Sequence, residues 1–507
     1  MTRAVIKLFL WYCILSETAV LSQNPLGLRA ASSLRGILFG AEVEVEHLRN
    51  HADQDQYNQQ VTNNYHLIVP GVELKPRIIW QGEHLYNFTD GDFLLGGPNA
   101  TGWVQQNMMQ IRGHNLVWAR DQTTPAWLLR NESTITPDHA KQLLSDYIHT
   151  VVGRYRGKIL CWDVINEAVD DFNNTNPLNI RDCFWFRKLG IDFLKYAFIF
   201  AHEADPNVKL YYNEYAIENI GLKANRTVAL INWLRSQGAI IDGVGLQWHI
   251  SVSTNVTPGD GHYQSAQQFI NNGLDIMVTE LDVSVPTNGG YPVDSHDLEI
   301  QANIYGSILN YVLHFSPNCK AMLTWGFTDR YSWIPDFTHD LRGAALPIDW
   351  MYLPKSAYWK MLDIMTHIVD DGVYRLSPQA EPDKCLGISQ NSTSNAVQLY
   401  NDGCNNVYEK WNITWLGDGT YRFSSVSNQN RVLGAYNTTA SVGGVQTYQW
   451  TGDENQEWAF SAQGNNTYHV VIRTAWWRVM SVYGTSDQIG IVDPSSSVPQ
   501  NWILTKV

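Results

Sequence analysis

Short apolar runs alternate with helix-length amphipathic segments through the first two-thirds of the chain. The runs are continuous rather than alternating, as in strands buried on both faces of a parallel sheet. Between them, apolar residues recur at helical spacing, for example after the N-cap and first-turn pair Thr136-Pro137. The predicted strands cover residues 36–43, 66–70, 111–118, 158–166, 208–213, 242–248, 275–283 and 320–326, and the predicted helices 53–64, 137–152, 184–204, 222–237, 265–272, 296–315 and 356–368.

Eight strands that alternate with helices or helix-length segments within residues 30–368 predict an α/β fold, the (β/α)8 TIM barrel. The alternative is an open doubly wound sheet. Such a sheet usually carries a glycine-rich phosphate loop after its first strand, and the sequence has none there.

The pattern changes beyond about residue 370. Gly, Asn, Ser and Thr dominate, and short strands alternate with turns. Three related units cover residues 386–411, 433–458 and 480–502, and their terminal tryptophans are 47 and 44 residues apart. This periodicity predicts a second, all-β domain over residues 372–507 built from a repeat.

The first 22 residues have the pattern of a signal peptide. Arg3 and Lys7 precede the apolar run 8–15, which is too short to span a bilayer. Ten Asn-x-Ser/Thr sequons fit a secreted, extracellular glycoprotein. The net charge of −14 argues against nucleic acid and acidic membranes as partners, and we expect a monomer.

Five cysteines remain once the signal peptide is removed. Cys385 and Cys404 are close in sequence and form the first expected disulfide. Cys161 with Cys183 is the second, which leaves Cys319 free and buried beneath a strand. No cysteine or histidine spacing indicates zinc, and we expect no metal and no cofactor.

Two predicted strands end on a glutamate. The strand over residues 158–166 breaks at Asn166-Glu167, and the strand over residues 275–283 breaks at Glu280. A (β/α)8 barrel has its active site at the C-terminal ends of its strands, so both side chains should meet there. Two carboxyl groups on one scaffold are the minimum for glycoside hydrolysis.

The neighbours of the two glutamates suggest separate roles. Asp282 points to the same side of the strand as Glu280, and His249 could lie between them. A carboxylate held by such an imidazole stays ionised, as a nucleophile must, which leaves Glu167 as the acid/base. Other strand ends offer hydrogen bonds and stacking surfaces for a sugar ring: His114, Trp118, Asn213, Gln247 and Trp325.

Five strings carry a specific resemblance. RGHNLVW, WDVINEA, YYNEY, GVGLQWH and VTELDV occur in this order on successive predicted strands and resemble glycoside hydrolase family 10, the retaining endo-β-1,4-xylanases. The resemblance implies Glu167 as acid/base, Glu280 as nucleophile and a covalent xylosyl-enzyme, with the carboxyls about 5 to 5.5 Å apart. It also implies that Asn166 binds the sugar 2-hydroxyl, that His249 and Asp282 support Glu280, and that Lys75, His114, Trp118, Gln247, Trp325 and Trp333 line the glycone subsites.

One position departs from the family pattern. The family's Asn-x-x-Lys is Val72 to Lys75 in this chain, and a valine cannot hydrogen-bond a sugar. We therefore expect weakened binding in a distal glycone subsite.

The C-terminal repeats resemble the ricin B-type β-trefoil of family 13 carbohydrate-binding modules, whose repeated tryptophans are core residues. The Asp that the family's sugar sites need early in each unit is missing in all three, so a structural trefoil and a lectin remain equally open. Tyr400 and Trp450 are the aromatic candidates for sugar contacts.

Together these observations predict a secreted retaining endo-β-1,4-xylanase whose partner is xylan or a related β-1,4-linked polysaccharide. A retaining β-1,4-glucanase with the same barrel is one alternative. A non-catalytic secreted lectin is the other.

Overall fold

The computed structural model describes residues 26–174, 176, 178–389, 394–464, 466–483, 488–494 and 500–507. The predicted signal peptide therefore lies outside the described residues. The chain divides into two compact units, one formed by Ile37–Met361 and the other by Met1–Gly36 with Leu362–Val507.

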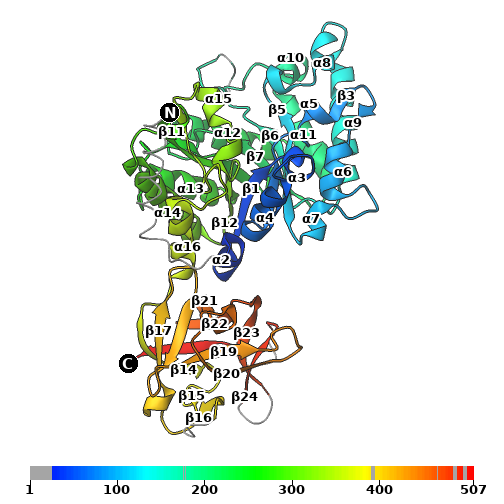
Figure 1. Ribbon diagram of the computed structural model, residues 1–507. Coiled ribbons are helices and arrows are strands. Elements are labelled where there is room, and N and C mark those ends of the chain that lie inside the picture. Colours follow the sequence, from blue (N-terminus) through cyan, green and yellow to red (C-terminus); the bar gives the residue numbers. More distant parts are fainter. Residues whose placement is uncertain are drawn as a thin grey trace. The chain divides into compact units, whose positions relative to one another are not determined.

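The first unit is a closed barrel of eight parallel strands within the described residues, as predicted. Each strand pairs with its neighbour in the chain, and β1 pairs with β12, so that the first and last strands lie side by side (Figure 1). The strands are β1 (Leu38–Val43), β2 (Leu67–Pro70), β5 (Gln110–Trp118), β6 (Cys161–Asn166), β7 (Lys209–Glu214), β8 (Gly243–Leu246), β10 (Asp275–Asn288) and β12 (Cys319–Thr324).

Helices follow the strands and cover the outside of the barrel. The prediction of one helix over residues 184–204 is wrong, because this segment forms two helices. Gly190, at φ +59°, ends α10 (Phe184–Leu189), and α11 (Asp192–Ala204) begins after it. The long β2–β5 connection holds elements that periodicity did not predict: α5 (Pro76–Ile79), β3 (Trp80–Gly82), β4 (Leu85–Tyr86), α6 (Thr89–Leu95) and α7 (Trp103–Gln106). The other main helices are α3 (Val45–Arg49), α4 (Gln54–Asn64), α9 (Pro137–Arg154), α12 (Leu222–Ser236), α13 (Gly261–Asn271), α14 (His296–Phe315) and α16 (Ser356–Thr366).

One of the two predicted disulfides is confirmed. Cys385 and Cys404 form a disulfide, and Cys319 is free and buried. The second predicted bridge is wrong, because Cys161 and Cys183 are both free. Cys161 belongs to the apolar cluster of the barrel strands, whereas Cys183 precedes α10, so the two thiols serve different parts of the core. Burial raises the pKa of each of the three free thiols to about 12.

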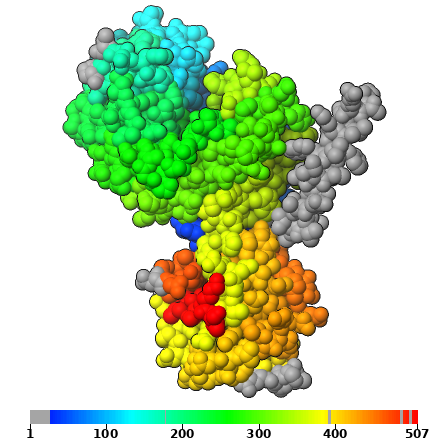
Figure 2. All heavy atoms as spheres, turned by 90° about the vertical axis from the view of Figure 1, so that its left-hand side faces the viewer, coloured from blue at the N-terminus to red at the C-terminus, as the bar shows by residue number. Residues whose placement is uncertain are grey.

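The second unit contains an all-β domain in which the described residues form one sheet of twelve strands, confirming the predicted change of architecture. The last strand pairs with the first, and the red C-terminal residues lie beside yellow ones in the space-filling view (Figure 2). The strands are β14 (Gly372–Pro378), β15 (Cys385–Ile388), β16 (Val397–Tyr400), β17 (Trp411–Trp415), β18 (Tyr421–Ser425), β19 (Arg431–Tyr436), β20 (Gly443–Gln449), β21 (Trp458–Gly464), β22 (Thr467–Ile472), β23 (Ala475–Tyr483), β24 (Gln488–Val492) and β25 (Trp502–Lys506).

The repeated tryptophans tie each unit of the repeat to its own start. Each is fully buried, and its indole N–H donates to the backbone carbonyl of the first residue of its unit. The three bonds are Trp411 to Leu386 at 2.9 Å, Trp458 to Leu433 at 2.9 Å and Trp502 to Met480 at 2.8 Å. The tryptophans are therefore core residues that specify the fold, as the resemblance implied.

Substitution of one of these tryptophans should destabilise the trefoil. Trp458→Phe removes a buried hydrogen bond and leaves a small cavity, so we expect a loss of about 1 to 3 kcal/mol in the free energy of unfolding. Trp477→Phe is the matched control, because Trp477 is 56% exposed. Urea unfolding would measure the stability of this domain in both variants, and equal unfolding midpoints for Trp458→Phe and Trp477→Phe would contradict the prediction.

Candidate active site

Glu280 is held at both carboxyl oxygens. Asn213 Nδ2 donates to Oε1 at 2.7 Å, and His249 Nε2 lies 3.0 Å from Oε2. On its other side His249 Nδ1 lies 2.8 Å from Asp282 Oδ2, so the imidazole bridges two carboxylates as the sequence predicted. This contact is possible because β9 (His249–Ser251) pairs in parallel with β10, His249 opposite Asp282.

The electrostatics of this group favour a charged imidazole and an ionised Glu280. Burial alone would raise the pKa of Glu280, but the hydrogen bond of His249 and the nearby imidazoles of His114 and His249 outweigh it, and the pKa is lowered. Burial would lower the pKa of His249, but the charge and hydrogen bond of Asp282, followed by those of Glu280, raise it well above 6.5. Glu280 is thus an oriented carboxylate.

Glu167 stands directly after β6 in the left-handed region, at φ +56°, a conformation uncommon for a residue with a side chain. Its backbone N–H donates to the carbonyl of Asn213 at 3.0 Å. Its Oε2 accepts from Arg120 Nε at 2.7 Å and its Oε1 from Gln247 Nε2 at 3.2 Å. The carboxyl is therefore as firmly oriented as that of Glu280.

Amide side chains connect the two glutamates. Asn213 Nδ2, which donates to Glu280, also donates to Asn166 Oδ1 at 2.8 Å. Gln247 Nε2, which donates to Glu167, also lies 3.3 Å from Asn166 Oδ1. Asn166 Nδ2 has only a contact of 3.5 Å with Glu167, so it is the amide donor best placed for a substrate hydroxyl.

Aromatic rings and a lysine lie beside this group. Lys75 Nζ lies 5.1 Å from the ring centre of Trp118 and 5.6 Å from that of Trp325. Trp325 also packs edge to face on His114, at 5.2 Å between ring centres. His114 is itself fully buried and bonded to Asp163 at 3.0 Å, so it lies beneath the aromatic rings.

Trp333 joins the same group. Its indole N–H donates to Asp282 Oδ2 at 3.0 Å, and its ring packs edge to face on His249 at 5.3 Å. The structure therefore brings all the barrel residues predicted for the site to one end of the barrel.

Arg120 is a site residue that the sequence analysis missed. Besides its bond to Glu167, its Nη2 donates to the hydroxyl of Tyr215 at 3.0 Å. Arg181 Nη2 donates to the same hydroxyl at 3.1 Å, and Arg181 Nε to the carbonyl of Glu167 at 3.3 Å. Arg120 lies two residues beyond Trp118 in the string RGHNLVWARD, so the strand-end argument that selected Trp118 could have found it.

The two trefoil candidates have packing roles. The ring of Tyr400 lies against Gly387, where a Cβ would come within 2.9 Å of it, and its hydroxyl donates to the carbonyl of Ile388 at 2.8 Å. Trp450 is half-buried beneath the guanidinium of Arg422, 5.3 Å from its ring centre. Sugar contacts by either residue stay a prediction.

Removal of the imidazole should change the pH dependence of activity. In His249→Asn, Glu280 loses the hydrogen bond that lowers its pKa. We therefore expect the acid limb of the pH profile of kcat/KM to move up by about 1 to 2 pH units. His296→Asn is the control, since His296 is exposed at the start of α14. Initial rates across the acidic range would measure the limb, and an unchanged limb in His249→Asn would contradict the argument.

The pair of His249 and Glu280 also makes the stability of the fold depend on pH. Because the pKa of His249 is raised, its stabilisation is complete below its ordinary value of 6.5 and is lost as the pH rises through the raised value. Because the pKa of Glu280 is lowered, its stabilisation is present above its ordinary value of 4.5 and is lost as the pH falls through the lowered value. Both contributions to stability are therefore complete between pH 4.5 and pH 6.5, the ordinary pKa values of the two groups.

Two features are absent from the described residues. They contain no group of three or more His, Cys, Asp or Glu side chains placed to hold a metal ion. Likewise, no helix in the described part of the chain is long and apolar enough to cross a membrane.

A pair of oriented carboxyl groups at the end of a (β/α)8 barrel, one kept ionised by an imidazole, defines a glycoside hydrolase. Comparison with known families agrees. The model of Glycosyl hydrolase family 10 matches residues 27–364, and the chain belongs to this family. The model of the ricin-type beta-trefoil lectin domain matches residues 373–502.

Individual relatives match the barrel region. Endo-1,4-beta-xylanase B of Thermotoga neapolitana is 33% identical over 314 residues, 62% of this chain and 84% of that protein. Endo-1,4-beta-xylanase B of Paenibacillus barcinonensis is 30% identical over 341 residues, 66% of this chain and 97% of that protein. The crystal structure of native xylanase 10B from Thermotoga maritima superposes with a TM-score of 0.60 at 31% identity, covering 67% of this chain and 98% of that one.

Proposed function

We propose that this protein is a secreted endo-β-1,4-xylanase that hydrolyses internal xylosidic bonds of xylan with retention of configuration. The observation that carries the proposal is the pair of oriented glutamates, Glu280 held by His249 and Asn213, and Glu167 held by Arg120 and Gln247. Membership of family 10 and the printed names of the relatives support xylan as the substrate.

The first step forms a covalent intermediate. A carboxylate oxygen of Glu280 attacks the anomeric carbon, and the glycosidic C–O bond breaks as Glu167 gives its proton to the leaving oxygen. His249 and Asn213 fix the attacking carboxylate, so little reorganisation is needed before attack.

The second step is the reverse with water. Glu167, now ionised, takes a proton from a water molecule whose oxygen attacks the anomeric carbon, and the bond to Glu280 breaks. Arg120 Nε, 2.7 Å from Glu167 Oε2, holds this side chain in the same position for both steps. Two inversions at the anomeric carbon give net retention.

Incubation with purified polysaccharides tests the proposal. We expect reducing ends from xylan and a β-anomeric first product by NMR. No product from any polysaccharide would overturn the enzymatic function and leave the lectin reading. An α-anomeric first product would overturn retention.

A β-1,4-glucanase is the second candidate. Val72 alters the glycone side, and one relative, 29% identical over 328 residues, carries the name Exoglucanase XynX, from Acetivibrio thermocellus. The chain spans 28% of that relative. Parallel assays on cellulose and mixed-linkage β-glucan distinguish the two, because a glucanase would release more reducing ends from these than from xylan.

Secretion follows from the N-terminal pattern and the sequons in the sequence. N-terminal sequencing of protein from the culture medium of an expressing eukaryotic cell should find a start near residue 23. Retention of the protein inside the cell with residues 1–22 intact would overturn this part of the proposal.

A further inference from the structure

A carboxyl group on β1 faces the end of the barrel beside the predicted glycone side, and nothing in the described residues binds it. Glu42 is half-buried, yet neither of its oxygens has a hydrogen-bond or ion-pair partner among those residues. It lies close enough to Lys75 and Glu280 for their charges to act on it. A partly buried polar group without a partner is unfavourable unless water or a ligand supplies one.

The end of β2 leaves room for this side chain. Gly71 carries no side chain, and a Cβ there would lie only 1.7 Å from Glu42 Oε1. The other oxygen lies near Gly326, where a Cβ would be 3.8 Å from it. Glu42 therefore occupies the space beside Val72, the position at which the sequence analysis expected a lost hydrogen bond.

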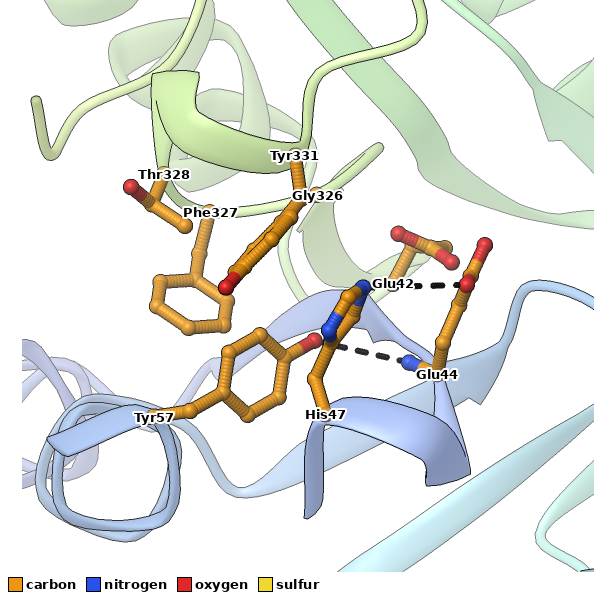
Figure 3. A pocket seen from close by; sticks show the side chains of 8 residues that line it. All are labelled: Glu42, Glu44, His47, Tyr57, Gly326, Phe327, Thr328 and Tyr331. Carbon is orange, nitrogen blue, oxygen red and sulfur yellow. Dashed lines mark hydrogen bonds and ion pairs between the residues drawn. The ribbon is translucent and has the colours of Figure 1, made fainter. Parts of the chain in front are cut away.

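A small pocket adjoins Glu42. This Glu42 pocket is lined by Glu42, Glu44, His47, Tyr57, Gly326, Phe327, Thr328 and Tyr331 (Figure 3). Tyr57 is 3% exposed, and its hydroxyl accepts from the backbone N–H of Glu44 at 3.4 Å. The hydroxyl hydrogen of Tyr57 has no acceptor in the described part of the chain. The pocket thus offers both an unused acceptor and an unused donor.

Lys75 adds a positively charged group close to Glu42. Its ammonium group lies over the rings of Trp118 and Trp325, and no described carboxylate or carbonyl accepts a hydrogen bond from it. Glu42 and Lys75 act on each other through charge without direct contact. A ring bearing several hydroxyls could bond to both groups at once, whereas an apolar ligand could bond to neither.

We propose that Glu42 determines the binding of the second glycone sugar, an uncharged pyranose unit whose hydroxyls its carboxyl binds in place of a side chain from β2. This inference rests on the proposed function and names a specificity residue within it. The surroundings of Glu42 favour its neutral form: burial, and then the charges of Glu44 and Glu73, raise its pKa well above the usual range. A neutral carboxyl can donate as well as accept a hydrogen bond.

Two aryl glycosides that differ by one sugar test the proposal. An aryl β-xyloside places a single sugar at Glu280, and the corresponding β-xylobioside adds the second glycone unit. The ratio of their kcat/KM values measures what the second unit contributes. In Glu42→Ala we expect this ratio to fall by about tenfold to a hundredfold, as for the loss of one or two hydrogen bonds to a sugar hydroxyl. In the isosteric Glu42→Gln, which keeps a donor and an acceptor, the ratio should fall by less.

Glu46→Gln is the matched control, because Glu46 is exposed on α3 next to the pocket residues but does not line it. Its ratio should equal that of the wild type. A ratio unchanged in both Glu42 variants, or lowered equally in Glu46→Gln, would overturn the inference alone. If the wild type hydrolyses neither glycoside nor xylan, the proposed function fails and this inference with it.

Discussion

Replacement of Glu280 by Gln is expected to lower kcat/KM on xylan by about 10⁴-fold or more, because an amide cannot form the covalent intermediate. Asn213 and His249 would still contact the side chain, so the fold should persist. Reducing-sugar assays would measure the loss, and circular dichroism would verify the fold. Asp275→Asn is the matched control, since Asp275 is the first residue of the same strand, before Glu280.

A chemical rescue makes the assignment specific. In Glu280→Gly the space of the lost carboxylate should admit azide, which would attack an activated aryl xyloside from the face that Glu280 used. The expected product is the α-xylosyl azide, identified by NMR. Activity of Glu280→Gln within about tenfold of the wild type would rule out Glu280 as the nucleophile.

Replacement of Glu167 by Ala should give the second largest loss, and its size should depend on the leaving group. On xylan we expect a fall of about 10²-fold to 10⁴-fold, the usual contribution of a general acid–base residue. For a dinitrophenyl xyloside the first step needs no proton, so it should be almost unaffected, and the slow second step should produce a burst of dinitrophenol.

Azide again distinguishes the role. With Glu167→Ala it should accelerate release of the intermediate and yield the β-xylosyl azide, because azide needs no base. Glu203→Ala, on the exposed side of α11, serves as control. An equal loss for good and poor leaving groups would contradict the assignment of Glu167 as acid/base.

The barrel and its proposed catalytic pair could be predicted from the sequence because both follow from local rules. Continuous apolar runs are typical of strands buried on both faces of a parallel sheet, and a polar residue that ends such a run is placed at the end of the barrel. Asn166, Glu167 and Glu280 were found in this way. The repeated tryptophans were likewise visible as a period, since a repeat copies its core residues.

Chain geometry beyond local rules decided the rest. The break at Gly190 depends on one left-handed residue within an otherwise helical pattern. The Cys161–Cys183 pair failed because sequence distance says nothing of where the two side chains are buried. The position of Arg120 just beyond a predicted strand was visible in the sequence, but its hydrogen bond to Glu167 came only from the structure.

The sequence by itself therefore determined the two architectures and the family, and it named the two proposed catalytic carboxyls. Only the tertiary structure decided the contacts around them. The sequence suggested an imidazole bridge between Glu280 and Asp282, but the bridge forms only because β9 and β10 pair in register. The unpartnered carboxyl of Glu42 beside Gly71 requires β1 and β2 to be neighbours. Contacts between strands depend on register and on the space that facing side chains leave, and neither quantity is written in a local pattern.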